Sequence, residues 1–299
     1  MNSAMENRSY RAVCFDLDGT LLPMELEDFL GSYFKALAPC IMRHGVSAED
    51  YQAGLNGGIK AMMKHDDDRT NDALFWETFY AHVDPDMADW TSVFLDFYEN
   101  DFGHIGDDMP ANPAAARAVN ALRAKGYPLA LTTMPVFPLR AVTWRVEWAG
   151  VDPAAFARIT TFDNSTSVKP KLAYFAENLA ALGLRGEDVL MVGNNTKEDL
   201  SFMQLGADAY LVTDCLIDPV EFDLESVRHG SLEQFADWVE ALPDCENPAT
   251  DIRPGLIPVE ERDAVLASYL DEEARAEDAA AGAAHLGAYD NVADAGVED

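Results

Sequence analysis

Short apolar runs alternate with stretches of helical periodicity along most of this chain. The apolar runs, which contain many strand-forming residues, lie at residues 10–16, 128–132, 188–193 and 208–213. Helical stretches precede or follow them at residues 116–126, 172–184 and 199–206. Strands that are apolar on both faces and alternate with helices are typical of parallel sheets covered on two sides. The pattern therefore predicts an α/β fold with a doubly wound parallel sheet.

A long segment after the first strand, roughly residues 24–109, lacks strand patterns and has a helical rhythm. Its apolar residues recur at helical spacing in residues 26–45, 47–64, 71–83 and 87–101. Ser47 followed by Asp50 is typical of a helix start, because the serine side chain can cap the first turn. Two interpretations stay open: the segment is a small helical lid over a site, or it only extends the core.

The chain is strongly acidic. Its 299 residues include 53 Asp and Glu against 21 Lys and Arg, which gives a formal net charge of −32. Long-range repulsion then argues against nucleic acid and anionic membranes as partners. An anionic ligand would have to be held by a few well-placed cations.

Several features bear on the location of the protein. No apolar run is long enough to span a bilayer, and the first ten residues lack the pattern of an export signal. Cys14, Cys40, Cys215 and Cys245 are scattered without zinc-type or disulfide-type spacing. We therefore expect a cytoplasmic protein with ordinary thiols.

Residues 246–299 differ from the rest of the chain, because they are rich in alanine and acid and poor in large apolar side chains. This composition predicts a tail that is mostly disordered or loosely docked. Within it, residues 259–279 carry an isolated apolar stripe at helical spacing, which indicates a helix that attaches to the body of the protein.

Polar residues whose side chains can take part in catalysis or ligand binding follow the apolar runs. Asp16 and Asp18 end the first run, and their spacing of two places both side chains on one face if the strand geometry continues. Thr132 and Thr133 end the second, and Lys169 precedes a proline at a helix start. Because ligands of open α/β sheets bind at the carboxyl ends of strands, we expect these residues to meet there.

The fourth group follows the run at 188–193. Asn195 with Glu198 three residues later is an ordinary helix-capping arrangement. Asn195 and Asp199 are also four residues apart, so that they share one face of a helix and are able to hold a ligand. The two roles are compatible.

Together, DLDGT at 16–20, LT at 131–132, KP at 169–170 and GNNTKED at 193–199 resemble, in order, the four motifs of the haloacid dehalogenase superfamily. The resemblance covers about residues 10–242. It implies a Rossmann-like core with a helical, C1-type cap inserted after the first motif. The implied division is a core of residues 1–23 and 110–245, a cap of residues 24–109, and an acidic tail of residues 246–299.

The resemblance also implies roles. Asp16 would be the nucleophile that becomes an aspartyl phosphate, and Asp18 the general acid and base. Thr132 and Thr133 would bind the phosphoryl oxygens, and Lys169 would neutralise their charge. The cofactor would be Mg²⁺, a hard cation that prefers oxygen ligands. Its implied ligands are Asp16, Asp18, Asp199 and Asn195, with Asn194 and Glu198 as further candidates.

The sequence departs from the family where an acid usually stands near position 194 or 195, since this chain has asparagine at both. We expect weaker Mg²⁺ binding rather than none. Asp18 argues against dehalogenation, which needs no acid for an alkoxide leaving group. We therefore expect a phosphatase acting on a small phosphorylated metabolite. The alternatives are a non-catalytic or weakly active protein that binds a phosphorylated ligand, and a phosphomutase.

Substrate identity should depend on the cap. Lys60 and Lys64 lie four residues apart after paired glycines, and we expect one of them to face the active site. Ordinary solvated surface lysines are the simpler interpretation of the same pattern.

Overall fold

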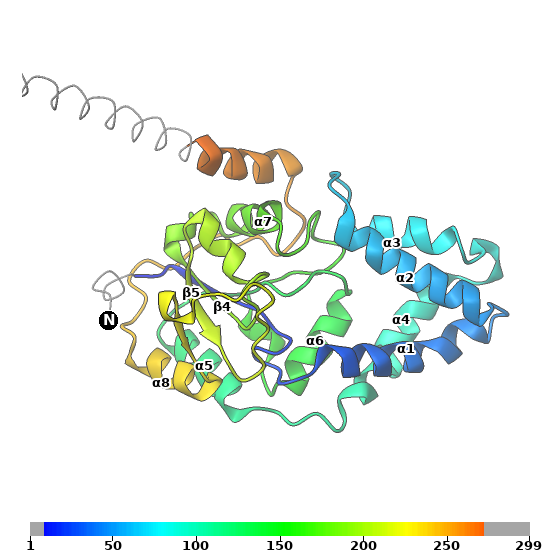
Figure 1. Cartoon of the computed structure of the whole chain (residues 1–299), viewed down its shortest axis with the longest axis horizontal. Helices are drawn as coiled ribbons and strands as arrows, with labels where there is room; N and C mark the ends of the chain where they lie inside the picture. The colour runs from blue at the N-terminus through cyan, green and yellow to red at the C-terminus, as the bar shows by residue number, and fades with distance from the viewer. Residues whose placement is uncertain (1–8, 272–299) are drawn as a thin grey trace, which may run out of the picture.

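The computed structural model describes residues 9–271, and within this range six strands form one all-parallel sheet (Figure 1). Their order across the sheet is β3-β2-β1-β4-β5-β6. The strands are β1 (Ala12–Phe15), β2 (Leu129–Leu131), β3 (Arg158–Ile159), β4 (Val189–Gly193), β5 (Asp208–Val212) and β6 (Arg228–Gly230). The strand order changes direction between β1 and β4, which is the doubly wound arrangement. The predicted fold class is confirmed.

Alternate residues of β1 enter two hydrophobic layers, because successive side chains of a strand point to opposite faces. The helices that cover the sheet are α5 (Pro113–Ala124), α6 (Leu139–Trp148), α7 (Leu172–Leu182), α8 (Leu232–Ala241) and the 3₁₀ helix η6 (Leu200–Leu205). Val13 and Phe15 pack in the cluster that contains α5, α6 and α8. Ala12 and Cys14 pack with α7 and η6. Burial on both faces explains why this strand is apolar throughout.

Four helices inserted between β1 and β2 form the predicted helical cap, which lies beside the sheet in Figure 1. They are α1 (Leu26–Met42), α2 (Ala48–Lys64), α3 (Asn71–Tyr80) and α4 (Trp90–Asn100). The Ser47 side chain caps α2 by accepting a hydrogen bond from the Asp50 N–H at 3.1 Å. Phe75 and Phe79 of α3 pack edge-on against Phe94 of α4. The cap therefore has an aromatic core of its own.

Short 3₁₀ helices complete the connections. They are η2 (Pro85–Met87), η3 (Phe102–Gly106), η4 (Pro153–Ala155), η5 (Gly186–Asp188) and η7 (Leu224–Ser226). No helix in residues 9–271 is both long enough and apolar enough to cross a membrane.

Two sets of contacts join the cap to the core. The Phe29 ring of α1 packs edge-on against the Phe137 ring, with 5.9 Å between centroids. On the other side, the Asn71 N–H at the start of α3 donates to the Ser165 carbonyl at 3.0 Å. The Asn71 side-chain amide donates to the Pro135 and Ser167 carbonyls at 2.9 and 3.2 Å.

Residues 246–271 lie against the core. The buried Arg158 guanidinium donates to the Arg253 and Gly255 carbonyls at 2.9 and 2.8 Å. Residues 259–271 are helical, and the Tyr269 hydroxyl accepts a hydrogen bond from the Gly186 N–H. This part of the acidic tail is packed because its carbonyl groups satisfy a buried cation. The remainder of the predicted tail, residues 272–299, lies outside the described residues.

Candidate active site

The candidate site lies where β1 and β4 end, at the point where the strand order changes direction. β1 and β4 pair in register, so Asp16 and Asn194 leave the sheet next to each other. Thr132 and Thr133 follow β2, the other neighbour of β1. Ligands of open parallel sheets bind beyond the strand ends at such a reversal. Polar residues from three separate segments therefore meet at this edge.

Lys169 joins two of the predicted carboxylates. Its Nζ donates to Asp16 Oδ1 at 2.8 Å and to Asp199 Oδ1 at 2.6 Å, and its side chain is 1% exposed. Burial lowers the pKa of this ammonium group, but Asp16 and Asp199 outweigh burial and raise the pKa above its ordinary value. Lys169 therefore stays charged and holds one oxygen of Asp16 in place.

Asp199 supports the loop after β4. Its Oδ2 accepts hydrogen bonds from the Asn194 and Asn195 N–H groups at 3.0 and 2.9 Å, while its Oδ1 accepts from Lys169. Burial raises the pKa of Asp199 to about 6. A Cβ at Gly193 would stand 2.2 Å from Asp199 Oδ2, so this close approach requires glycine.

Thr20 connects the first and fourth motifs. Its hydroxyl lies 3.1 Å from both Asp16 Oδ2 and Asn194 Oδ1. Gly19 has a φ of +83°, and a Cβ there would stand 2.3 Å from Asn194 Nδ2. The turn after Asp18 thus needs glycine for its conformation and for the approach of Asn194. Two side-chain oxygens, from Asp16 and Asn194, converge on one hydroxyl as a result.

Asn195 caps the turn that leads into η6. Its Oδ1 accepts hydrogen bonds from the Lys197 and Glu198 N–H groups, both at 3.0 Å. The capping role expected from the Asn195–Glu198 spacing is therefore present in the structure. Glu198 lines the cavity described below, and burial raises its pKa to about 7.

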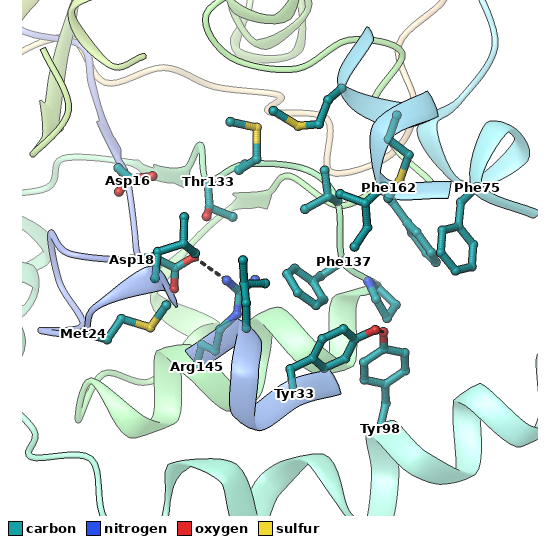
Figure 2. Close-up of a pocket in the computed structure, with 18 of the residues that line it drawn as sticks. Asp16, Asp18, Met24, Tyr33, Phe75, Tyr98, Thr133, Phe137, Arg145 and Phe162 are labelled. Atoms are coloured by element: carbon teal, nitrogen blue, oxygen red, sulfur yellow. Dashed lines mark hydrogen bonds and ion pairs between the residues drawn. The ribbon is translucent and has the colours of Figure 1, made fainter. Parts of the chain in front are cut away.

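The two predicted threonines have different surroundings. The Thr132 hydroxyl donates to the Phe15 carbonyl at 3.3 Å, and the residue is fully buried between the strands. The Thr133 side chain lines the cavity near Asp16 (Figure 2), and its hydroxyl has no hydrogen-bond partner among residues 9–271. Buried hydroxyls are normally paired, so Thr133 has donor capacity for a ligand.

Arg145 is a site residue that the sequence interpretation missed. Figure 2 shows its guanidinium Nη1 donating to Asp18 Oδ2. Its side chain is 1% exposed, it lies over the Phe137 ring at 4.7 Å, and its Nη2 has no partner among the described residues. Burial raises the pKa of Asp18, and Arg145 opposes this rise.

A signal for Arg145 exists in the sequence. α6 buries Ala141, Val142 and Val146 on one face, and Arg145 lies on that same face, four residues after Ala141. A cation on the buried face of an amphipathic helix requires a buried acceptor or counter-charge. Asp18 is that counter-charge.

A cavity of about 1670 Å³ extends from the site to the cap. At its polar end lie Asp16, Asp18, Thr133, Asn194 and Glu198. Thr132 and Lys169 are not among its lining residues, because both are enclosed behind Asp16. Lys60 of α2 lines the cavity and Lys64 does not, so one of the two predicted lysines faces this space.

The comparisons with known proteins identify the family. A family model of haloacid dehalogenase-like hydrolases matches residues 10–205, which is more than half of the chain. The chain belongs to the haloacid dehalogenase-like hydrolases, as the resemblance of its four motifs implied. A search of curated proteins finds no significant match.

Solved structures with a similar fold include phosphatases and dehalogenases. A predicted phosphoglycolate phosphatase from Haemophilus somnus is 15% identical, with 77% of this chain and 97% of that chain covered and a TM-score of 0.49. A HAD phosphatase from Thermococcus onnurineus is 17% identical, with 80% of this chain and 100% of that chain covered and a TM-score of 0.48. An L-2-haloacid dehalogenase is 17% identical, with 78% of this chain and 100% of that chain covered and a TM-score of 0.46. These likenesses do not separate the two activities.

Proposed function

We propose that this protein is a Mg²⁺-dependent phosphatase that hydrolyses a small phosphorylated metabolite through an aspartyl-phosphate intermediate. The position of Asp16 carries the proposal. Its carboxylate lines the cavity, while Lys169 and Thr20 each bind one of its oxygens. An ionised carboxylate held in this way can attack phosphorus at neutral pH.

In the first step, Asp16 Oδ2 bonds to phosphorus and the bond from phosphorus to the ester oxygen breaks. Asp18, which lines the same cavity, gives its proton to the departing alkoxide. Burial raises the pKa of Asp18 and so favours the protonated form that this role needs. The unpaired Thr133 hydroxyl donates to a phosphoryl oxygen.

In the second step, a water molecule gives a proton to Asp18 while its oxygen bonds to phosphorus. The bond between phosphorus and Asp16 Oδ2 breaks, inorganic phosphate leaves, and Asp18 is protonated again. Lys169 remains beside Asp16 throughout and offsets the negative charge on the carboxylate that is released. An acid at Asp18 would have no role in the removal of a halide, and this favours a phosphatase over a dehalogenase.

The oxygens of the site fit Mg²⁺. Residues 9–271 contain no group of three or more His, Cys, Asp or Glu placed to hold a metal. Mg²⁺ commonly takes one or two protein oxygens and completes its shell with water and substrate phosphate. Asn194 Oδ1, which shares the Thr20 hydroxyl with Asp16, would supply one such oxygen, and Asp16 Oδ1, the oxygen that does not attack phosphorus, would supply another. When bound, the ion would offset the charge of the phosphoryl group and of the carboxylates around it.

Other predicted ligands are differently placed for that role. Asp199 also lines the cavity, and its Oδ1 accepts the Lys169 hydrogen bond alone, so this oxygen remains a proposed ligand. Asn195 would have to leave its capping position. The backbone carbonyl of Asp18 and the carboxylate of Glu198 remain proposed ligands.

The asparagines at 194 and 195 favour one alternative function. In the family an acid usually stands near position 194 or 195, and the neutral amide found here would hold Mg²⁺ less strongly than a carboxylate. A protein with this change could bind a phosphorylated ligand with little turnover. The activity assay below distinguishes the two functions.

We also propose a cytoplasmic location and a small phosphorylated molecule as the partner. The four cysteines are free thiols, which persist in reducing compartments. The net charge of −32 disfavours nucleic acid as a ligand.

The experiment is hydrolysis of p-nitrophenyl phosphate by the full chain with Mg²⁺, with excess EDTA, and by the variant Asp16→Asn. We expect activity with Mg²⁺, its loss in EDTA with recovery on adding Mg²⁺, and a loss of at least about 10³-fold in Asp16→Asn. The matched control is Asp108→Asn, because Asp108 is an exposed carboxylate of the cap outside the cavity. It should keep wild-type activity.

Activity that survives in Asp16→Asn would contradict Asp16 as the nucleophile. A folded wild-type protein that binds Mg²⁺ and phosphate but turns over no ester would support the binding function instead.

A further inference from the structure

The walls of the cavity beyond its polar end are largely apolar. The cap contributes Leu30, Phe34, Ile59, Met62, Met63, Phe75, Trp76 and Phe94 to them, and the core contributes Val136, Phe137 and Phe162. At about 1670 Å³ the cavity exceeds the range of about 300–1,000 Å³ that is usual for small-molecule sites. A phosphoryl group with a small polar metabolite would leave most of these walls facing water.

Exposed apolar side chains gather at the rim of the same cavity. Leu26 of α1, Leu95 of α4, Leu139 of α6 and Ile217 are 50%, 57%, 52% and 42% exposed, and all four line it. Single exposed apolar residues are normal on a protein surface, but a concentration around a concave site marks a surface that binds an apolar ligand.

Several polar groups of the walls are already paired with each other, and those that a polar ligand would meet include Lys60, Asn56, Thr91 and Thr143. The Tyr33 and Tyr98 hydroxyls lie 2.9 Å apart and are hydrogen bonded to each other (Figure 2). Arg140 is paired with Glu99 at 3.0 Å. Further carboxylates at Glu25, Glu27 and Asp28 line the cavity near α1. A second anionic group on the ligand would meet these acids near α1, and Lys60 of α2 is an exposed cation on another part of the lining.

We propose that the substrate is a phosphate monoester of a bulky apolar alcohol, with its phosphate at Asp16 and its hydrocarbon part against the cap. This inference rests on the proposed phosphatase function and specifies its substrate class. Sugar phosphates and nucleotides are disfavoured, because the apolar walls would have to desolvate their hydroxyls without pairing them.

The first test compares kcat/KM for the monophosphates of ethanol, butanol, hexanol, octanol and decanol with kcat/KM for glucose 6-phosphate and adenosine monophosphate. Each methylene that enters the cavity should raise kcat/KM by about threefold. Decyl phosphate should exceed both polar substrates by at least about 100-fold. A flat series, or a preference for either polar substrate, would overturn the inference.

The second test uses a rim variant with a matched control. Leu95→Asp places a charge at an exposed position of the cavity rim, and Leu256→Asp makes the same change at a leucine of similar exposure outside the cavity. For decyl phosphate, Leu95→Asp should raise KM by about 5- to 10-fold with little change in kcat, because it removes apolar binding only. Ethyl phosphate should be unaffected in both variants. Equal effects of the two substitutions would contradict the placement of the hydrocarbon part.

A binding measurement separates this inference from the proposed function. Decylphosphonate, which has no ester bond to hydrolyse, is titrated into the full chain with Mg²⁺ by calorimetry, with ethylphosphonate as the control. Binding at least about 100-fold tighter for decylphosphonate supports the apolar ligand class even if no ester is turned over. Turnover of p-nitrophenyl phosphate with equal binding of the two phosphonates would leave a phosphatase but overturn the substrate class.

Discussion

At the scale of single residues, the ion pair with Arg145 acts on Asp18, the proposed proton donor. Burial raises the pKa of Asp18, and the Arg145 guanidinium opposes that rise. The rings of Phe29 and Phe137 lie against the Arg145 guanidinium and exclude water from one side of it. The pair therefore fixes the position of Asp18 while limiting how strongly it holds a proton.

Removal of Arg145 should move the pH dependence of catalysis upward. In the proposed mechanism Asp18 is the general acid and acts in its protonated form, so kcat/KM should fall as pH rises through its pKa. Without Arg145 that pKa should rise further, and the alkaline limb of the kcat/KM profile should shift to higher pH in Arg145→Met. The measurement is a pH–rate profile with ethyl phosphate at saturating Mg²⁺, because an alkoxide leaving group needs the proton of Asp18.

Arg140→Met is the matched control for this shift. Arg140 lines the same cavity, but it pairs with Glu99 and stacks on Trp144 rather than binding Asp18. The alkaline limb of the kcat/KM profile of Arg140→Met should therefore lie at the same pH as in the wild type. A limb that moves to lower pH in Arg145→Met, or equally in both variants, would refute the role assigned to this ion pair.

The sequence predicted which residues meet at the candidate site because the relevant signals are local. Asp16, Asp18, Thr133 and Asn194 each follow a strand, and parallel strands bring their carboxyl ends to one edge. Arg145 was missed because its partner lies 127 residues away in the sequence, and no spacing rule connects them. The different surroundings of Thr132 and Thr133 depend on how β2 leaves the sheet, which periodicity does not specify.

At the scale of elements, the close packing of α2 on α3 depends on glycine. A Cβ at Gly58 would stand 2.6 Å from the Phe75 ring, and one at Gly54 would stand 3.1 Å from the Phe79 ring. Small residues let the two helices approach until the rings of α3 touch the α2 backbone. Phe75 also lines the cavity, so this contact sets the position of one cavity wall.

Gly58→Ala should therefore destabilise the protein although alanine favours helix. Alanine gains about 1 kcal/mol in helix propensity, but the displaced Phe75 ring costs about 1–3 kcal/mol. We expect a net loss of about 1 kcal/mol in the free energy of unfolding, measured by urea denaturation. Gly31→Ala in α1 is the control, because nothing lies within 4 Å of its added Cβ, and it should be neutral or stabilising. Equal stability changes in the two variants would contradict the packing argument.

Elements that the sequence pattern missed are short or shaped by tertiary contacts. β3 has two residues and β6 three, too few to show a period of two. The stretch at 199–206 was predicted as a helix, and it forms the 3₁₀ helix η6, which begins beside the hydrogen-bonded carboxylate of Asp199. The long cap helices were predictable because each spans several turns of apolar periodicity.

At the scale of the whole molecule, the loop between α2 and α3, together with the first residue of α3, fastens the cap to core residues 135, 165, 167 and 171. Asn71 is fully buried and uses both ends of its amide, since Oδ1 pairs with His65 Nε2 at 2.7 Å and Nδ2 donates to two core carbonyls. Lys171 pairs with Asp66 at 3.0 Å, and Arg262 of the C-terminal helix pairs with Asp68 at 3.0 Å. Cap, core and C-terminal segment therefore meet at one loop.

Asn71→Asp should weaken the attachment of the cap to the core, because it removes the two side-chain hydrogen bonds that Asn71 donates to core carbonyls. The carboxylate would face the Pro135 and Ser167 carbonyl oxygens without a proton to donate, and leaving buried groups unpaired costs about 2–4 kcal/mol. We expect a lower urea midpoint, faster proteolysis within residues 65–72, and a higher KM for long-chain esters, because the cap wall would no longer be held at a fixed distance from Asp16. Asn120→Asp is the control, since Asn120 is exposed on α5 and lies outside the cavity. If Asn71→Asp changed stability without affecting proteolysis of the loop or KM, the contact would be structural only and would not hold the cavity in shape.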